Sequence, residues 1–108
     1  MKLKTTLFAI LLCSSAGAIA ADNEFQLVIR EHKFEPAELT VPAGQKIRLV
    51  VKNEDATPEE FESRKLKREK VIAGKGSATL LIGPLAPGVY PFAGEYHEAS
   101  AQGKLIAK

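Results

Sequence analysis

The stretch "FEPAELTVPAGQKIRLVVKNED", residues 34–55, decides the expected fold of this 108-residue chain. Its apolar residues recur at every second position, with Leu39 and Val41 in a first run and residues 47–51 in a second. A Pro-Ala-Gly segment at residues 42–44 separates the two runs and is a turn signal. Because successive side chains of a strand point to opposite faces, this period is typical of half-buried β-strands. The stretch therefore predicts two β-strands joined by a turn.

The same alternation continues on both sides of this stretch. The further expected strands are "EFQLVIREHKF" (24–34), "SATLLIG" (77–83), "GVYPFAG" (88–94) and "GKLIAK" (103–108). No segment carries an apolar stripe of helical period, and strands spaced about ten residues apart with turn signals between them are typical of a sandwich. We therefore expect a single all-β domain.

The first twenty residues, "MKLKTTLFAILLCSSAGAIA", have the composition of a secretory signal peptide. Two lysines precede an apolar run at residues 7–12, and the segment ends in the A-x-A pattern at Ala20. The apolar run is too short to span a bilayer, and the large residue before Cys13 disfavours lipid attachment there. We expect cleavage after Ala20, export to the periplasm of a domain formed by residues 21–108, and no membrane insertion of the mature chain.

Composition excludes several classes of function. Cys13 is the single cysteine and would leave with the signal peptide, so the mature domain is expected to have neither a disulfide nor a thiolate ligand. The precursor has a formal net charge of +2, and no basic tract argues for a nucleic-acid partner. A nucleophile with a paired base, a phosphate-binding loop and a zinc signature are all missing from the sequence, which disfavours a hydrolase.

Two long runs resemble the two halves of the cupredoxin fold. In residues 34–55, an F-x-P opens a strand, a V-x-A-G turn follows, and an Asn ends the next strand. In "LAPGVYPFAGEYHEASAQGKLIAK", residues 85–108, the L-x-P-G-x-Y-x-F pattern resembles the approach to the metal-binding loop. The resemblance implies an all-β, cupredoxin-like Greek-key β-sandwich. It does not by itself imply the metal of the family, because function depends on the site.

The blue-copper ligands that the resemblance would imply are mostly missing. Such a site holds copper with a Cys thiolate, two His and a weak axial Met. In this chain Gly94 stands at the Cys position, and the axial Met position falls near Ala101 or Gln102. His97 matches the second His of the family. One copper ligand therefore remains, which argues against a blue-copper electron carrier.

Carboxylates stand at or near the positions of the lost ligands. Glu59 or Glu60 occupies the place where the resemblance puts the first His, and Glu62 follows shortly after. Glu95 stands beside His97, and the resemblance implies that both lie at the same pole of the sandwich as Glu59 and Glu60. A set of carboxylates with one imidazole suits iron, manganese, zinc or Cu(II), and loss of the thiolate removes the preference for Cu(I). Strand alternation puts Glu59 and Glu60 on opposite sides, so these residues do not all face one site. The predicted metal ligands are His97, Glu95, Glu59, Glu60 and Glu62.

A narrower resemblance favours iron over copper. The string "TPEEFES...REKVI...GPL.PG.YPF.GE.H...AQGKL" is similar to small periplasmic proteins related to the cupredoxin domain of bacterial EfeO-type iron-uptake proteins. That group implies binding or oxidation of iron ahead of a ferrous-iron permease. The expected partner is a periplasmic iron-binding protein or an inner-membrane iron permease. The alternatives are a Cys-less copper-binding protein and a metal-free cupredoxin scaffold that binds another protein.

Two aromatic side chains and one basic segment are expected to be surface features without a role in metal binding. His32 is expected to be a surface residue at a strand end, and Tyr96 a solvent-edge aromatic whose phenol could alternatively contact a metal. The basic segment "RKLKREK", residues 64–70, is expected to be a solvated edge strand whose lysines discourage edge pairing. Docking of this segment to an acidic partner is the alternative.

Overall fold

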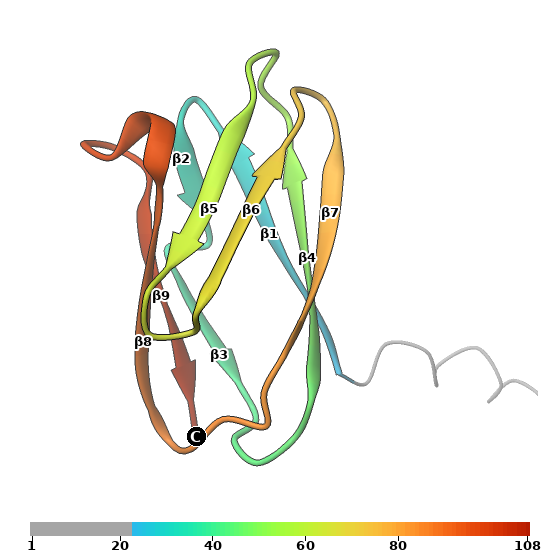
Figure 1. Cartoon of the computed structure of the whole chain (residues 1–108), viewed down its shortest axis with the longest axis vertical. Coiled ribbons are helices and arrows are strands. Elements are labelled where there is room, and N and C mark those ends of the chain that lie inside the picture. The colour runs from blue at the N-terminus through green and yellow to red at the C-terminus, as the bar shows by residue number, and fades with distance from the viewer. Residues whose placement is uncertain (1–22) are drawn as a thin grey trace, which may run out of the picture.

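The computed structural model of the chain describes residues 23–108, in which two β-sheets pack against each other (Figure 1). The predicted signal peptide and its cleavage site lie outside the described residues. The strands are β1 (Glu24–Arg30), β2 (Lys33–Glu35), β3 (Glu38–Val41), β4 (Ile47–Asn53), β5 (Glu59–Ser63), β6 (Arg68–Ile72), β7 (Ser77–Ile82), β8 (Gly88–Gly94) and β9 (Gln102–Ala107), and the 3-10 turn η2 spans Glu95–His97. The predicted all-β sandwich is confirmed.

The chain moves between the two sheets in the manner of a Greek key. One sheet has the order β2-β1-β4-β7 and the other the order β3-β9-β8-β5-β6. The pairs β1/β4 and β3/β9 are parallel, whereas the other pairs are antiparallel. Parallel neighbours cannot be joined by a tight hairpin, so the connections between them cross from one sheet to the other. Residues 64–67 of the basic segment form the turn after β5, and the segment ends in β6, which lies at the edge of its sheet. The predicted edge strand is therefore confirmed only from Arg68 onward.

The core lies between the sheets and is built from the alternating positions seen in the sequence. Leu27 and Ile29 of β1 and Leu49 and Val51 of β4 are completely buried. Phe34, Phe61 and Phe92 meet in the interior, where the rings of Phe34 and Phe92 make an edge-to-face contact with 4.9 Å between centroids. Burial of each such side chain stabilises the fold by about 1.5 to 3 kcal/mol.

The predicted strand over residues 24–34 is interrupted by a tight turn at Glu31 and His32. Both residues adopt left-handed backbone conformations, with φ of 53° and 58°. The turn folds β2 back onto β1, and Val28 lies opposite Glu35. A continuous strand was therefore the wrong prediction here, and the break in alternation explains why: Glu31 occupies a position that would otherwise point into the apolar core.

Three connections meet at one end of the sandwich. The β1–β2 turn, the loop before β5 and η2 all lie at the upper end of the molecule, opposite the C-terminus (Figure 1). The hydrogen bond from Asn53 Nδ2 to the carbonyl of Thr57 (2.8 Å) orders the loop that leads into β5. This end therefore collects side chains that are far apart in the sequence. Within residues 23–108, no helix has the length and apolar character needed to cross a membrane.

Candidate metal centre

Glu59 is a buried carboxylate at the start of β5. Its side chain shares the inner face of the strand with Phe61 and is 1% exposed. Oε2 accepts hydrogen bonds from the backbone N–H groups of Tyr96 (2.9 Å) and Glu60 (3.2 Å), and Oε1 lies 2.6 Å from His97 Nδ1. Both oxygens therefore have partners, as a buried ionised carboxylate requires.

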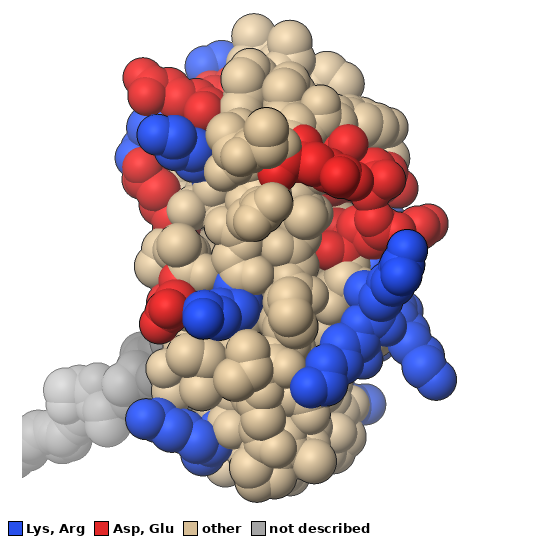
Figure 2. Space-filling view, turned by 90° about the vertical axis from the view of Figure 1, so that its left-hand side faces the viewer, with Lys and Arg blue, Asp and Glu red and all other residues tan. Residues whose placement is uncertain are grey.

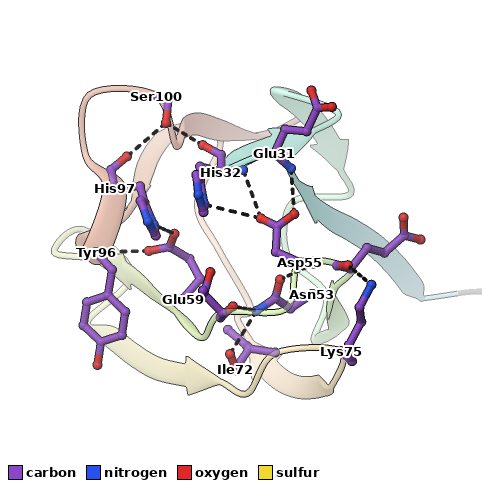
Figure 3. A network of polar contacts seen from close by, with 12 residues as sticks. Glu31, His32, Asn53, Asp55, Glu59, Ile72, Lys75, Tyr96, His97 and Ser100 are labelled. Carbon is purple, nitrogen blue, oxygen red and sulfur yellow. Dashed lines mark hydrogen bonds and ion pairs between the residues drawn. The ribbon is translucent and has the colours of Figure 1, made fainter.

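His97 and His32 form a stacked pair of imidazoles beside this carboxylate (Figure 3). Their ring centroids are 3.6 Å apart and their planes differ by 11°. One potential ligand atom from each of His32, Glu59 and His97 lies within 4.8 Å of the other two. The side chains of His97 and His32 are 29% and 43% exposed, so solvent reaches the cluster from the side of the rings.

The stacked arrangement limits how both imidazoles could bind one ion. The lone pair of an imidazole nitrogen lies in the plane of its ring, and in nearly parallel rings these lone pairs do not converge on one point. An ion bound by His32 and His97 together would therefore require at least one ring to turn out of the stack. The partial exposure of both rings leaves space for that rotation.

The structure separates the predicted ligands into two groups. Glu59 and His97 lie in the cluster, whereas Glu60 and Glu62 belong to the opposite face of β5, where they pair with Val71 and Glu69 across to β6. Glu95 is exposed at the start of η2. Its hydrogen bond with Glu62, with burial adding to the effect, raises the pKa of the Glu62 carboxyl. The cluster of possible ligands does not include Glu60, Glu62 or Glu95. Glu60 and Glu62 were predicted because they share a stretch of sequence with Glu59, and alternation along β5 puts them on its other face. Glu95 was predicted because it stands beside His97 in η2, where it is exposed.

His32 is the cluster residue that sequence reasoning missed. It was interpreted as a surface residue, and its place in the cluster depends on the left-handed turn after β1. Glu31 was the available signal of this turn. It is a charged residue at a position where the alternation of β1 would place a buried side chain, so it marks the end of the strand just before His32. Tyr96, by contrast, contributes its backbone N–H to Glu59, while its half-exposed ring points away from the imidazoles (Figure 3).

A thiolate copper site does not fit these residues. A Cβ atom added to Gly94 would lie 2.7 Å from Cδ and Oε2 of Glu59 and 2.7 Å from the Cβ of Ala101. The Glu59 carboxylate thus takes the space that a cysteine side chain at Gly94 would need. Two imidazoles and one carboxylate form a different donor set, which is found with non-haem Fe(II) and suits other borderline divalent ions.

A comparison with protein families identifies the fold family of the chain. The cupredoxin-like domain family matches residues 3–107. The chain belongs to this family. The described residues form the β-sandwich expected of this family, and Gly94 offers no thiolate.

Solved structures with the same fold include copper proteins. Auracyanin A, described as a "blue" copper protein of Chloroflexus aurantiacus, superposes with a TM-score of 0.68 at 18% identity over 79% of this chain and 98% of that chain. Amicyanin of Paracoccus versutus superposes with a TM-score of 0.64 at 17% identity over 84% of this chain and 87% of that chain. At these identities the similarity shows the cupredoxin-like fold alone.

A relative with higher identity comes from Rickettsia prowazekii (strain Madrid E). This uncharacterized protein is 43% identical over 83 residues, which cover 77% of the present chain and 66% of the relative. The match thus spans slightly less than two thirds of that protein. The narrower resemblance to the EfeO-type group stays a prediction.

Proposed function

We propose that this cupredoxin-like protein binds a divalent first-row metal ion through His32, Glu59 and His97, and that its ion is iron held for a ferrous-iron uptake permease in the periplasm. The observation that supports the proposal is that three potential ligand atoms, from three separate segments of the chain, lie within 4.8 Å of one another. Iron is the cargo in this proposal. The periplasmic iron-binding protein or inner-membrane permease expected from the resemblance is the partner that would deliver or receive it.

The donor set is suited to ferrous iron. Two imidazoles and one carboxylate leave coordination positions open on the metal, and the carboxylate contributes one negative charge. Oε2 of Glu59 is engaged by two backbone N–H groups, so Oε1 is the oxygen that would bind an ion, which would replace its present contact with His97 Nδ1. Because Glu59 is buried and hydrogen-bonded and the imidazoles are partly exposed, an ion could enter and leave from the imidazole side.

Copper is the second candidate, and the structural comparisons support it. Auracyanin A is a blue copper protein, and this chain shares its fold. Imidazole and carboxylate ligands also hold Cu(II). Because Cu(II) outcompetes Fe(II) at most nitrogen and oxygen sites, a comparison of affinities in vitro does not identify the physiological ion.

A titration of the purified protein with Fe(II) under anaerobic conditions tests the site, with a matched pair of variants. Glu59→Gln removes the ligand charge, and Glu60→Gln makes the same change one residue away on the outer face of β5. We expect Glu59→Gln to weaken Fe(II) binding by at least about 10-fold, because replacing even a residue that only supports a metal ligand has an effect of this size. Glu60→Gln should bind Fe(II) like the parent. Equal Fe(II) affinity of the two variants would show that Glu59 is not a ligand.

The metal found in protein purified from the periplasm of its native cells separates the two candidate ions. Iron in the parent and its loss in His97→Ala would support the proposal. Copper in place of iron would favour the second candidate. A parent protein that carries no metal and binds neither Fe(II) nor Cu(II) would contradict both and leave the metal-free scaffold as the interpretation.

A further inference from the structure

The turn that carries His32 is held by residues from two other loops. We infer that Asp55 is a positioning residue of the metal site, which holds the His32 imidazole so that Nε2 is its ligand atom, with Ser100 as a second support. This inference rests on the proposed function and adds to it the residues that make His32 a ligand. Neither Asp55 nor Ser100 offers a ligand atom in the cluster.

Asp55 binds the backbone of the β1–β2 turn with both carboxylate oxygens (Figure 3). Oδ1 accepts the N–H of Glu31 at 2.8 Å, and Oδ2 accepts the N–H of His32 at 3.0 Å. Both residues have left-handed backbone conformations, which are strained in residues other than glycine and persist only where the surroundings impose them. The two hydrogen bonds that Asp55 accepts provide that restraint.

The same carboxylate acts on the imidazole ring of His32. Oδ2 of Asp55 lies 3.4 Å from His32 Nδ1, longer than an ordinary hydrogen bond but close enough for its charge to favour a proton on that nitrogen. A proton on Nδ1 leaves the lone pair on Nε2. Histidine ligands of metals commonly direct their second ring nitrogen to a carboxylate in this way, which fixes the tautomer and the ring orientation.

Ser100 connects the segments of the two imidazoles. Its Oγ donates a hydrogen bond to the carbonyl of His32 at 2.7 Å, and its backbone N–H donates to the carbonyl of His97 at 3.1 Å. The turn after β1 is therefore held from one side by Asp55 and from the other by the residues that follow η2. Loss of either support would let His32 move away from Glu59 and His97.

The tautomer of His32 in the metal-free parent tests the inference without any bound ion. Nitrogen-15 NMR of the imidazole at about pH 8, above the ordinary pKa of histidine, reports which ring nitrogen carries the proton. We expect the proton on Nδ1 of His32 in the parent and in Glu54→Gln. In Asp55→Asn we expect a shift of the proton toward Nε2. A parent in which Nε2 of His32 is protonated would overturn the inference, whether or not any variant folds.

Metal binding supplies the second test, with Cu(II) as a spectroscopic probe and Fe(II) as the proposed ion. Glu54→Gln is the matched control, because Glu54 neighbours Asp55 but pairs with Arg30 instead of His32. We expect Asp55→Asn to weaken binding by about 10- to 100-fold and Ser100→Ala to weaken it less. Pulsed EPR of bound Cu(II) should detect two imidazoles in the parent and in Glu54→Gln, but one in Asp55→Asn.

The outcomes distinguish this inference from the proposed function. If Asp55→Asn binds as tightly as Glu54→Gln and keeps two imidazoles on Cu(II), Asp55 supports the turn alone and the inference is wrong. If the parent itself binds no metal, the proposed function fails, and the tautomer of His32 still shows whether Asp55 orients the ring.

Discussion

The two faces of β5 carry the same residue type in different surroundings. Glu59 points inward, is 1% exposed, and has partners for both of its carboxylate oxygens. Glu60 and Glu62 point outward, next to other acidic residues and to solvent. On the side of the molecule where β8 and β9 lie, acidic side chains gather above long basic ones (Figure 2). The comparison shows that residue type makes a carboxylate a possible ligand, whereas burial and hydrogen bonds decide which carboxylate is held in place.

Removal of each carboxylate in turn should give the largest difference in stability between the two faces of β5. Glu59→Ala leaves the N–H groups of Glu60 and Tyr96 without their acceptor and opens a cavity beside His97. We expect a loss of about 2 to 4 kcal/mol in the free energy of unfolding, measured by urea denaturation of the metal-free protein. Glu60→Ala should change it by no more than about 0.5 kcal/mol. Similar losses for the two variants would mean that the two faces of β5 do not differ as described.

The substitution Gly94→Ala tests the packing around Glu59 without altering a charge. The Cβ atom of Gly94→Ala would press on the Glu59 carboxylate and Ala101, and overpacking of this kind costs about 1 to 3 kcal/mol. For a domain of this size, each kcal/mol lowers the melting temperature by about 4 to 8 °C. Gly88, at the other end of β8, is the control, because its Cβ would make only ordinary contacts at 3.8 Å or more. If the Gly94→Ala protein has the same melting temperature as Gly88→Ala and still binds metal, the Glu59 carboxylate can move aside.

Substitution of Glu62 on the outer face of β5 should change the melting temperature less, and the change should depend on pH. The pKa of Glu62 is raised chiefly by its hydrogen bond with Glu95, so the folded state binds this proton more tightly than the unfolded state. Stability from this group is present at low pH and is lost as pH rises from about 4.3, the ordinary value for glutamate, through the raised pKa. Glu62→Gln should therefore melt slightly higher than the parent at neutral pH, and equally below about pH 4. Added salt should reduce the difference, and a lower melting temperature of the variant at neutral pH would contradict this account.

Much of the fold could be predicted from the alternation of apolar residues. The expected strands at residues 39–41, 47–51, 77–83 and 88–94 correspond to β3, β4, β7 and β8, because an apolar side chain at every second position can be buried only on one face of a strand. The turn at Glu31 and His32 was missed. Left-handed conformations at residues other than glycine have no strong local signal, and these two depend on Asp55, which lies more than twenty residues away in the sequence.

The candidate site could be predicted only in part. Glu59 and His97 were found because they stand at ligand positions of a known fold, and the structure brings them to within hydrogen-bond distance. Glu60 and Glu62 shared the same stretch of sequence, and alternation showed that the two faces differ without showing which face is buried. Pairing of β5 with β8 and β6 places Glu59 inside and leaves its neighbours outside.

The sequence by itself determined the all-β class, which follows from local periodicity. Residue type, at the positions that the cupredoxin resemblance assigns to the ligands, gave the loss of the thiolate at Gly94 and the presence of carboxylates nearby. Only the tertiary structure decided that Glu59 occupies the space of a side chain at Gly94 and that His32 stacks on His97. These contacts join segments of the chain that meet only when the two sheets pack. Their geometry depends on hydrogen bonds between loops, which no pattern within one segment contains.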